Sequence, residues 1–205
     1  MLTAALAVGG YVLGSCPWGY WLVRIFRHED VRQEGSGNIG GTNVWRLYGA
    51  SLGLPVLVLD VLKGFVPALL AVILVSHLAG LIVGSAAMAG HWRPLFLRFA
   101  RGGKVIATGG GVFFAVAPLV ALTALAVWVT LFFSLGFASL ASMVATAITP
   151  IAAWAYGYPR SVVAFGAGTA LAAAYLHRGN ISRLRAGTES RSGIALMTRL
   201  RSDHP

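Results

Sequence analysis

Four long apolar stretches with very few charged residues restrict what this chain can fold into. They cover roughly residues 2–26, 50–76, 78–97 and 105–176, and a helix needs only about 20 apolar residues to cross the hydrocarbon core of a membrane. Apolar residues make up 57% of the 205 positions and charged residues 11%, which leaves too few polar residues for a water-facing surface. The stretch from Leu54 to Val75 is apolar at odd and even positions alike, unlike a strand of a membrane barrel. The sequence therefore predicts an all-α integral membrane protein.

Clusters of basic residues next to these stretches predict the topology. The positive-inside rule places such clusters in the cytoplasm. Two spans with a tight outer turn near Ser76–His77 would join the first cluster to the second, which puts the N-terminus outside. An even number of crossings must follow, and residues 105–176 allow two long helices or four short ones. No basic residue precedes Arg24, so we expect the first stretch to be a retained span rather than a signal peptide. The three clusters are Arg24, Arg27, Arg32 and Arg46; Arg93, Arg98, Arg101 and Lys104; and Arg178, Arg183, Arg185, Arg191, Arg199 and Arg201.

The net charge of +10 indicates anionic partners. The charges lie beside membrane stretches, so we expect lipid headgroups and anionic substrates rather than nucleic acid. The single cysteine, Cys16, excludes an internal disulfide and a thiolate metal cluster. We expect no metal and no cofactor.

The stretch "EGSGNIGGTNVWR", residues 34–46, contains a G-x-G-x-x-G pattern, and Asp60 follows twenty positions after Gly40. A dinucleotide-binding fold needs a strand before this pattern and a ribose-binding acid outside the membrane, and the apolar flanks provide neither. Glycines instead let backbone N–H groups face one concavity that binds an anion. Ser36, Asn38, Asn43 and Arg46 add side-chain donors, so this segment predicts a phosphate site, with a flexible polar loop as the alternative.

A second candidate site is "RGGKVIATGGG", Arg101 to Gly111. Lys104 follows Gly102 and Gly103 as in a Walker loop, but Val105 stands where that loop has Ser or Thr. Glycine N–H groups and one ammonium at the start of an apolar helix still favour an anion. The alternative is a lysine that extends to the membrane surface.

The third candidate is "HRGNISRLRAGTESR", from His177 to Arg191. His177, Asn180 and Arg183 are spaced to share one helix face, which could bind phosphate or transfer a proton. The alternative is a basic tail that contacts lipid headgroups.

Polar residues inside the apolar stretches have both structural and functional interpretations. Asp60 and Lys63 can pair on one helix, either to support the glycine-rich loop or to act in catalysis, and the sequence leaves this open. His91 is expected to pack rather than to react. Gly80 and Gly84 favour close helix packing.

Ser139 and Ser142 are three residues apart on an apolar helix. Their residue type and setting alone predict hydrogen bonds back to the preceding turn of that helix.

Six segments in order resemble the bacterial acyl-phosphate-dependent glycerol-3-phosphate acyltransferases, small membrane enzymes that make lysophosphatidic acid. They are "GSCPWGYWLVR", "GSGNIGGTNVWR", "LDVLKG", "GHWRPLFLRFARGGKVIAT", "SLASM" and "HRGNISRLRAGTE". The resemblance runs almost end to end. It implies seven transmembrane helices, some short, with the N-terminus outside and the C-terminus in the cytoplasm. It also implies one polytopic domain over residues 1–205, with active-site loops near 27–49, 93–108 and 177–192, in the bacterial inner membrane.

The resemblance also implies the site residues. Carried over to this sequence, the catalytic residues are Ser36, Lys104, His177 and Asn180, and the substrate- and phosphate-binding residues are Gly37, Asn38, Gly40, Asn43, Arg46, Gly102, Gly103, Ser142 and Glu189. The substrates would be acyl phosphate and glycerol 3-phosphate, and we expect a monomer.

Three residues depart from the family's pattern. Ala100 is inserted before Arg101 and Val105 replaces the last glycine of the second motif, so the backbone path there could differ. Gly136 stands where the family often has a basic residue, so one phosphate or lipid contact could be missing.

The expected mechanism is direct attack of the sn-1 hydroxyl on the acyl phosphate. Lys104, Arg46, Ser36 and Asn180 would bind phosphate, glycine N–H groups would stabilise the oxyanion, and His177 or a substrate phosphate would accept the proton. No histidine has Asp five positions later, which disfavours the His-x4-Asp chemistry of thioester-dependent acyltransferases. An organic-phosphate transporter and a noncatalytic lipid-binding scaffold are the rival interpretations.

Overall fold

The structure, a computed structural model, describes residues 1–191. The regular structure of these residues is helical, and no strand occurs among them, which confirms the all-α prediction. The chain divides into two compact units, Met1–Ala121 and Leu122 onward. Arg199 and Arg201 of the third basic cluster, and residue 192 at the end of the predicted third loop, lie outside the described residues.

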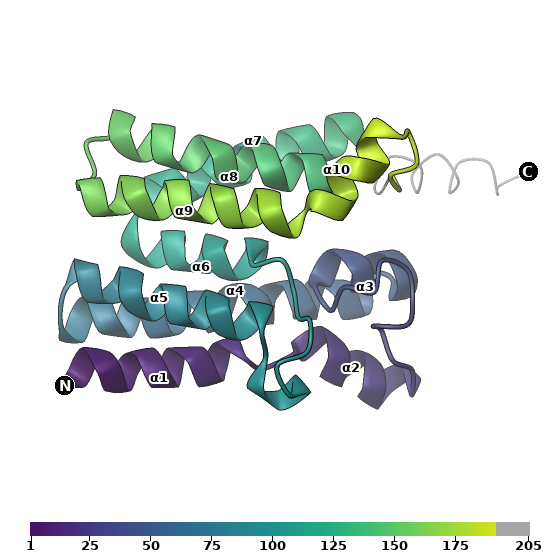
Figure 1. Ribbon diagram of the computed structural model, residues 1–205, viewed down its shortest axis with the longest axis horizontal. Coiled ribbons are helices and arrows are strands. Elements are labelled where there is room, and N and C mark those ends of the chain that lie inside the picture. The colour runs from purple at the N-terminus through teal and green to yellow at the C-terminus, as the bar shows by residue number, and fades with distance from the viewer. Residues whose placement is uncertain (192–205) are drawn as a thin grey trace, which may run out of the picture. The chain divides into compact units, whose positions relative to one another are not determined.

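The first unit is built around one long helix (Figure 1). This helix, α4 (Ala50–Leu74), contacts all five other α-helices that lie wholly within the unit. Helix α1 also packs on α5, and α5 on α6. The remaining elements are α1 (Leu2–Gly14), α2 (Trp18–Arg27), α3 (Gly41–Tyr48), α5 (His77–Trp92), the 3₁₀ turn η1 (Leu95–Leu97) and α6 (Ile106–Val116).

The first apolar stretch, expected as one helix, is two. Helix α1 ends at Gly14, and α2 begins at Trp18 after the N-cap residue Pro17. Proline has no N–H and restricts the residue before it, so it is well suited to the start of a helix, although α4 also accommodates Pro55 and Pro67 in its interior. Arg24 and Arg27 then lie in the last turn of α2, where cations interact favourably with the helix dipole.

Helix α4 has two contrasting faces. Large apolar side chains on one face are 39–68% exposed, namely Leu54, Val58, Leu62, Val66, Leu70 and Ile73. Asp60 and Lys63 lie on the opposite, buried face with small residues such as Gly64 and Ala68. Intramembrane charges typically face the protein interior in this way. Helices α4, α7 and α8 are long and apolar enough to cross a membrane.

Glycines allow close helix contacts in the first unit. A Cβ on Gly84 would overlap Val112 of α6, and one on Gly80 would overlap Val72 of α4, which confirms the expected close packing. The predicted turn between α4 and α5 is also present, because the Ser76 hydroxyl caps α5 by accepting a hydrogen bond from Ala79 N at 3.2 Å.

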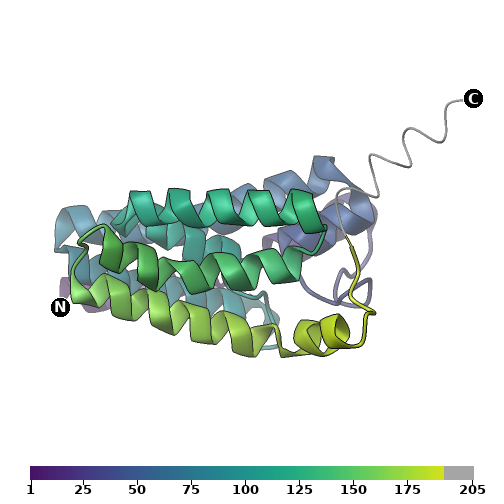
Figure 2. The same ribbon diagram turned by 90° about the horizontal axis from the view of Figure 1, so that it is seen from above.

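The second unit consists of α7 (Pro118–Leu135), which begins in the first unit, α8 (Ala138–Ala155), α9 (Arg160–Leu176) and the short α10 (Arg178–Arg185). Helices α7, α8 and α9 run alongside one another in Figure 2, from teal to yellow-green, and α8 packs on α9. Residues 105–176 thus contain four helices rather than two. Gly136, one of the departures from the family pattern, has φ +77° at the end of α7, a left-handed conformation that favours glycine.

Candidate functional site

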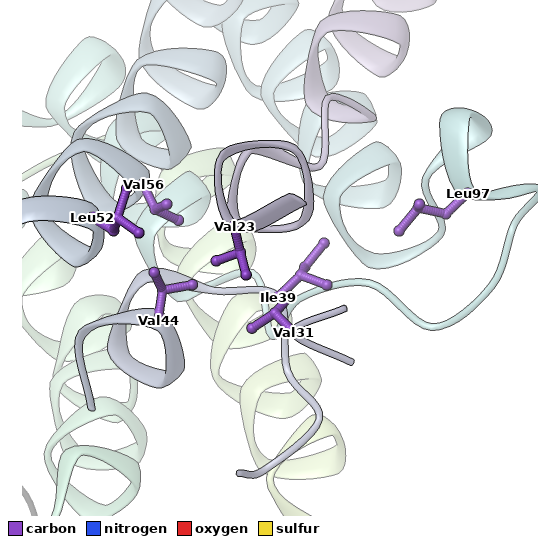
Figure 3. Close-up of a cluster of buried hydrophobic side chains, with 7 residues drawn as sticks. All are labelled: Val23, Val31, Ile39, Val44, Leu52, Val56 and Leu97. Atoms are coloured by element: carbon purple, nitrogen blue, oxygen red, sulfur yellow. The ribbon is translucent and has the colours of Figure 1, made fainter. Parts of the chain in front are cut away.

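The glycine-rich loop between α2 and α3 is anchored by apolar side chains. Val31 and Ile39, near its two ends, are 0% and 1% exposed and belong to one buried cluster (Figure 3). The other members of the cluster come from α2, α3, α4 and η1, namely Val23, Val44, Leu52, Val56 and Leu97. The loop therefore has a fixed path, unlike the flexible polar loop that was the alternative.

Asn43, on α3, holds this loop in shape. Its Oδ1 accepts a hydrogen bond from Ser36 N at 3.1 Å, and its Nδ2 donates to Glu34 O at 3.3 Å and to Asn38 O at 2.9 Å. Asn43 is 3% exposed, and both of its amide hydrogens are used within the loop. The structure thus gives this predicted phosphate ligand a positioning role.

The predicted anion-binding concavity needs a correction. The N–H groups of Ser36, Gly37 and Gly40 donate to Asn43 Oδ1, Glu34 O and Asn38 Oδ1, so these three bonds stabilise the loop itself. Gly35 and Gly37 have φ +57° and +66°, and the left-handed backbone explains the need for glycine there. The Ser36 and Arg46 side chains are exposed and are the candidates for contact with a substrate.

The second half of the first candidate segment, residues 34–46, lies in helix α3. Residues 41–48 are helical, although the whole segment was expected as a loop. The Tyr48 hydroxyl at its end donates to Glu29 Oε2 at 2.7 Å. Burial, together with this hydrogen bond, raises the pKa of Tyr48 to about 12. The phenol therefore stays protonated and keeps donating to Glu29 at physiological pH.

The glycines of the second motif also use their N–H groups internally. Gly102 N donates to Trp92 O and Gly103 N to His91 O, each at 2.9 Å, so they satisfy carbonyls at the C-terminal end of α5. A Cβ on Gly103 would overlap the His91 ring. These N–H groups are bound to α5 and do not form the expected oxyanion site. We call Gly102–Val105 the strap.

Lys104 is the half-buried charged residue of the strap. It lies two residues before α6, where an anion is favoured by the helix dipole. Val105, which replaces a glycine of the family pattern, has φ +61°, so the backbone keeps a left-handed conformation that a β-branched residue adopts only at a cost. The side chain of Val105 is 3% exposed, and its burial offsets part of that strain.

In the second unit, a hydrogen bond to the backbone determines which tautomer a neutral His177 adopts. This residue joins α9 to α10 and is 3% exposed. Its Nδ1 lies 2.8 Å from Ala173 O, and because a carbonyl can only accept, Nδ1 carries the hydrogen. The lone pair is then on Nε2, so a neutral His177 can accept a proton at that atom.

Glu189 joins three side chains of the second unit. Its Oε1 accepts hydrogen bonds from Ser139 Oγ at 2.7 Å and Asn180 Nδ2 at 2.6 Å, and Arg183 Nε donates to Oε2 at 2.7 Å. Asn180 and Arg183 therefore share a face of α10, as predicted. Burial favours the neutral acid, but the three hydrogen bonds and the Arg183 charge outweigh it and lower the pKa of Glu189.

These contacts give Glu189 and Ser139 roles that differ from those expected. An ionised Glu189 repels phosphate, and its hydrogen bonds join Ser139, Asn180 and Arg183; direct contact of Glu189 with a substrate stays a prediction. Ser139 donates to Glu189 and not to the preceding turn of its helix.

Ser142 makes the backbone hydrogen bond predicted from its helical setting, to Ala138 O at 2.7 Å. Its Oγ also accepts from Trp128 Nε1 of α7 at 3.0 Å. Because its hydroxyl hydrogen is used in this bond, Ser142 offers a substrate only its remaining lone pair.

Residues 1–191 contain no group of three His, Cys, Asp or Glu side chains placed to hold a metal ion. The predicted residues fall into three local groups. Ser36, Gly37, Asn38, Gly40, Asn43 and Arg46 lie on the first loop and α3; Gly102, Gly103 and Lys104 form part of the strap; and Ser142, His177, Asn180 and Glu189 lie in the second unit.

Comparison with known proteins decides the family. The sequence profile of the glycerol-3-phosphate acyltransferases matches residues 4–187. This chain belongs to the glycerol-3-phosphate acyltransferase family. The glycerol-3-phosphate acyltransferase of Desulforudis audaxviator is 44% identical over 191 residues, which are 93% of this chain and 96% of that protein. The enzyme of the same name from Roseiflexus sp. is 45% identical over 192 residues, or 91% and 94% of the two chains.

Crystal structures of one integral membrane glycerol 3-phosphate acyltransferase, PlsY, have the same fold as this family member. Its glycerol 3-phosphate form has a TM-score of 0.91 at 38% identity and covers 97% of this chain and 99% of that one. Its lysophosphatidic acid form has a TM-score of 0.87 at 38% identity and covers 94% and 96%. The resemblance inferred from the six sequence segments is confirmed, and this acyltransferase family member is a membrane protein.

Proposed function

We propose that this chain transfers a fatty acyl group from acyl phosphate to the sn-1 hydroxyl of glycerol 3-phosphate. The products are lysophosphatidic acid and inorganic phosphate. The match to the acyltransferase family over residues 4–187 carries this proposal, because it includes every predicted site residue except Glu189. The PlsY structures in glycerol 3-phosphate and lysophosphatidic acid forms support the acceptor and the product.

The proposal includes a topology. Seven helices cross the bacterial inner membrane as one polytopic domain, with the N-terminus outside and the active site on the cytoplasmic side, and the protein acts as a monomer. The helix lengths support part of it: α4, α7 and α8 are long enough to span, and α5 and α9, with 16 and 17 residues, are close to that length, whereas α1 and α6, with 13 and 11 residues, would be the short crossings that the family resemblance implies. The basic residues of the three predicted cytoplasmic segments support the orientation.

Acyl phosphate is the donor that fits the side chains. It is a mixed anhydride whose leaving group is phosphate, so the reaction needs cationic groups and little general-base power. No histidine of the chain has the His-x4-Asp spacing that thioester-dependent acyltransferases use. Lys104 and Arg46 supply positive charge near glycine-rich segments, and the Ser36 hydroxyl and the Asn180 amide add hydrogen bonds.

In the proposed mechanism, His177 accepts the proton of the sn-1 hydroxyl. The sn-1 oxygen attacks the carbonyl carbon, its proton moves to His177 Nε2, and the bond from the carbonyl carbon to the phosphate oxygen breaks. The hydrogen bond from Nδ1 to Ala173 O holds the required tautomer. A phosphate oxygen of the substrate is the alternative proton acceptor. The first loop and the strap act through side chains, because the N–H groups of Ser36, Gly37, Gly40, Gly102 and Gly103 donate within the protein.

Acyl transfer by the purified protein tests the proposal. Labelled glycerol 3-phosphate is supplied with palmitoyl phosphate or palmitoyl-CoA, with Lys104→Ala as the inactive control. We expect lysophosphatidic acid from palmitoyl phosphate alone, and loss of product in the control. Product formed from palmitoyl-CoA alone would contradict the proposal that acyl phosphate is the donor. Uptake of organic phosphate into vesicles, without any product, would favour a transporter.

A further inference from the structure

Three ionisable side chains are buried together in the first unit and have no role in the mechanism above. Asp60 and Lys63 of α4 are each 2% exposed, and His91 of α5 is 3% exposed. Asp60 Oδ1 lies 2.7 Å from Lys63 Nζ and 3.7 Å from His91 Nδ1. We call these residues the buried triad.

The triad joins several elements. Lys63 Nζ also donates to Cys16 O at 2.9 Å, and Cys16 lies in the break between α1 and α2, just before Pro17. The ammonium is therefore held between a carboxylate of its own helix and a carbonyl of this break. With these two bonds made and 2% exposure, the Lys63 ammonium is shielded from a substrate phosphate and is already compensated by its buried partners. A catalytic role for Lys63 is therefore disfavoured.

His91 connects the triad to the strap. The carbonyl of His91 accepts the hydrogen bond from Gly103 N at 2.9 Å, and the His91 ring lies so close to Gly103 that a Cβ there would overlap it. The residue after Gly103 is Lys104. The position of the His91 ring therefore limits where the backbone of Lys104 can lie.

The start of α6, which follows Lys104 in the chain, also packs closely against α4 next to the triad. Thr108, in the first turn of α6, is 0% exposed, and its carbonyl lies so close to Gly64 that a Cβ there would overlap it. Gly64 follows Lys63 directly on α4. Lys104 thus lies between two close contacts, one on His91 and one on the neighbour of Lys63.

We infer that Asp60, Lys63 and His91 are positioning residues that hold the strap and thereby set the place of the Lys104 ammonium. The consequence for catalysis rests on the proposed function, in which Lys104 binds a phosphate group. Stability alone is a weak reason for burying such a pair, because well-packed apolar residues of similar size are often equally or more stabilising. The contacts of His91 with Gly103 of the strap give it a functional reason.

The test uses a property of this sequence. The chain has two lysines, Lys63 and Lys104, and only Lys104 is not buried. Modification of Lys104 by an amine-acylating reagent, followed by mass spectrometry, reports on its position whether or not the protein is active. His91→Leu and the double variant Asp60→Asn/Lys63→Met remove the triad without leaving a buried unpaired charge. The matched control is His77→Leu, which changes the same residue type at the opposite end of α5.

We expect the two triad variants to fold, with a changed rate of Lys104 modification and a kcat/KM for glycerol 3-phosphate that is about 100-fold lower, the scale of a displacement of about 1 Å. His77→Leu should match the wild type in both measurements. Gly103→Ala, which forces the strap away from the His91 ring, is the second route to the same displacement if the triad variants do not fold.

Unchanged modification rates at Lys104 in folded triad variants, or in Gly103→Ala, would overturn the inference. Equal effects in His77→Leu would also overturn it, because the change would then be a general loss of stability. An inactive wild type with the expected modification pattern would refute the proposed function and leave the positioning of Lys104 intact.

Discussion

Replacement of Glu189 should destabilise the second unit by an amount that its hydrogen bonds predict. The Glu189 side chain is 6% exposed and accepts bonds from Ser139, Asn180 and Arg183. A hydrogen bond to a charged group contributes about 1.5–3 kcal/mol. The Arg183 side chain is 44% exposed, so its ion pair is screened by solvent and contributes only about 0–1 kcal/mol.

These values rank three variants. Glu189→Ala removes all three partners and should lower the free energy of unfolding by about 3–7 kcal/mol. Glu189→Gln keeps an oxygen for Ser139 and Asn180 but faces Arg183 with an amide, so we expect a loss of about 1–2 kcal/mol. Arg183→Met should cost less than about 1 kcal/mol.

Unfolding by a denaturing detergent in mixed micelles, followed by tryptophan fluorescence, measures the three differences. Acyl transfer, measured in parallel, should fall most in Glu189→Ala, because Asn180 loses its orienting partner. A loss in Arg183→Met equal to that in Glu189→Ala would show that the exposed ion pair dominates. A loss below about 1 kcal/mol in Glu189→Ala would refute the central role of the carboxylate.

Three further predictions concern pH, backbone strain and the first loop. The folded-state pKa of Glu189 is below its ordinary value of 4.5. The stabilisation of the fold by ionised Glu189 is therefore complete above pH 4.5 and is lost as the pH falls through the folded-state pKa. The acid unfolding curves of the wild type and Glu189→Ala should converge at pH values below that folded-state pKa. At Val105, with φ +61°, glycine should be more stable than alanine by about 1 kcal/mol, the reverse of the usual order, and thermal unfolding of Val105→Gly and Val105→Ala would show it. Asn43→Ala removes three loop hydrogen bonds and should expose residues 29–40 to limited proteolysis, whereas Ser85→Ala, which removes only a bond to Leu81 O within α5, should not.

Much of the fold follows from local sequence. Apolar stretches with few charges predict membrane helices, and the turn at Ser76–His77 was placed correctly between α4 and α5. The break at Pro17 was missed because hydropathy is continuous across residues 2–26, although proline and its effect on the preceding residue were a local signal for it.

The use of hydrogen bonds at the candidate site could not be predicted from the motifs. Glycine-rich segments suggested free N–H groups, yet Gly102 and Gly103 donate to carbonyls of α5 that lie about ten residues earlier. Ser139 donates to Glu189, fifty residues away in the chain. Spacing within a motif identifies residues that can share a face, but a partner that comes from another helix depends on how the helices pack.

Two of the departures from the family pattern, Val105 and Gly136, lie at positions with a left-handed backbone. Val105 keeps the left-handed backbone, with φ +61°, at a position where the family pattern has glycine. Gly136 has φ +77° where the pattern often has a basic residue. Arg191, the last described residue, lies with its guanidinium 5.0 Å from the ring centroid of Phe137, the residue after Gly136, so a positive charge lies next to that neighbouring side chain.

The central claim, that the sn-1 oxygen attacks the acyl carbon and displaces phosphate, is tested most directly by following one oxygen atom. Glycerol 3-phosphate labelled with oxygen-18 in its sn-1 hydroxyl is mixed with palmitoyl phosphate and the purified protein. We predict that lysophosphatidic acid and inorganic phosphate form in equal amounts, with the label retained in the ester and absent from the released phosphate. Label in the released phosphate, or phosphate released without lysophosphatidic acid, would contradict the account.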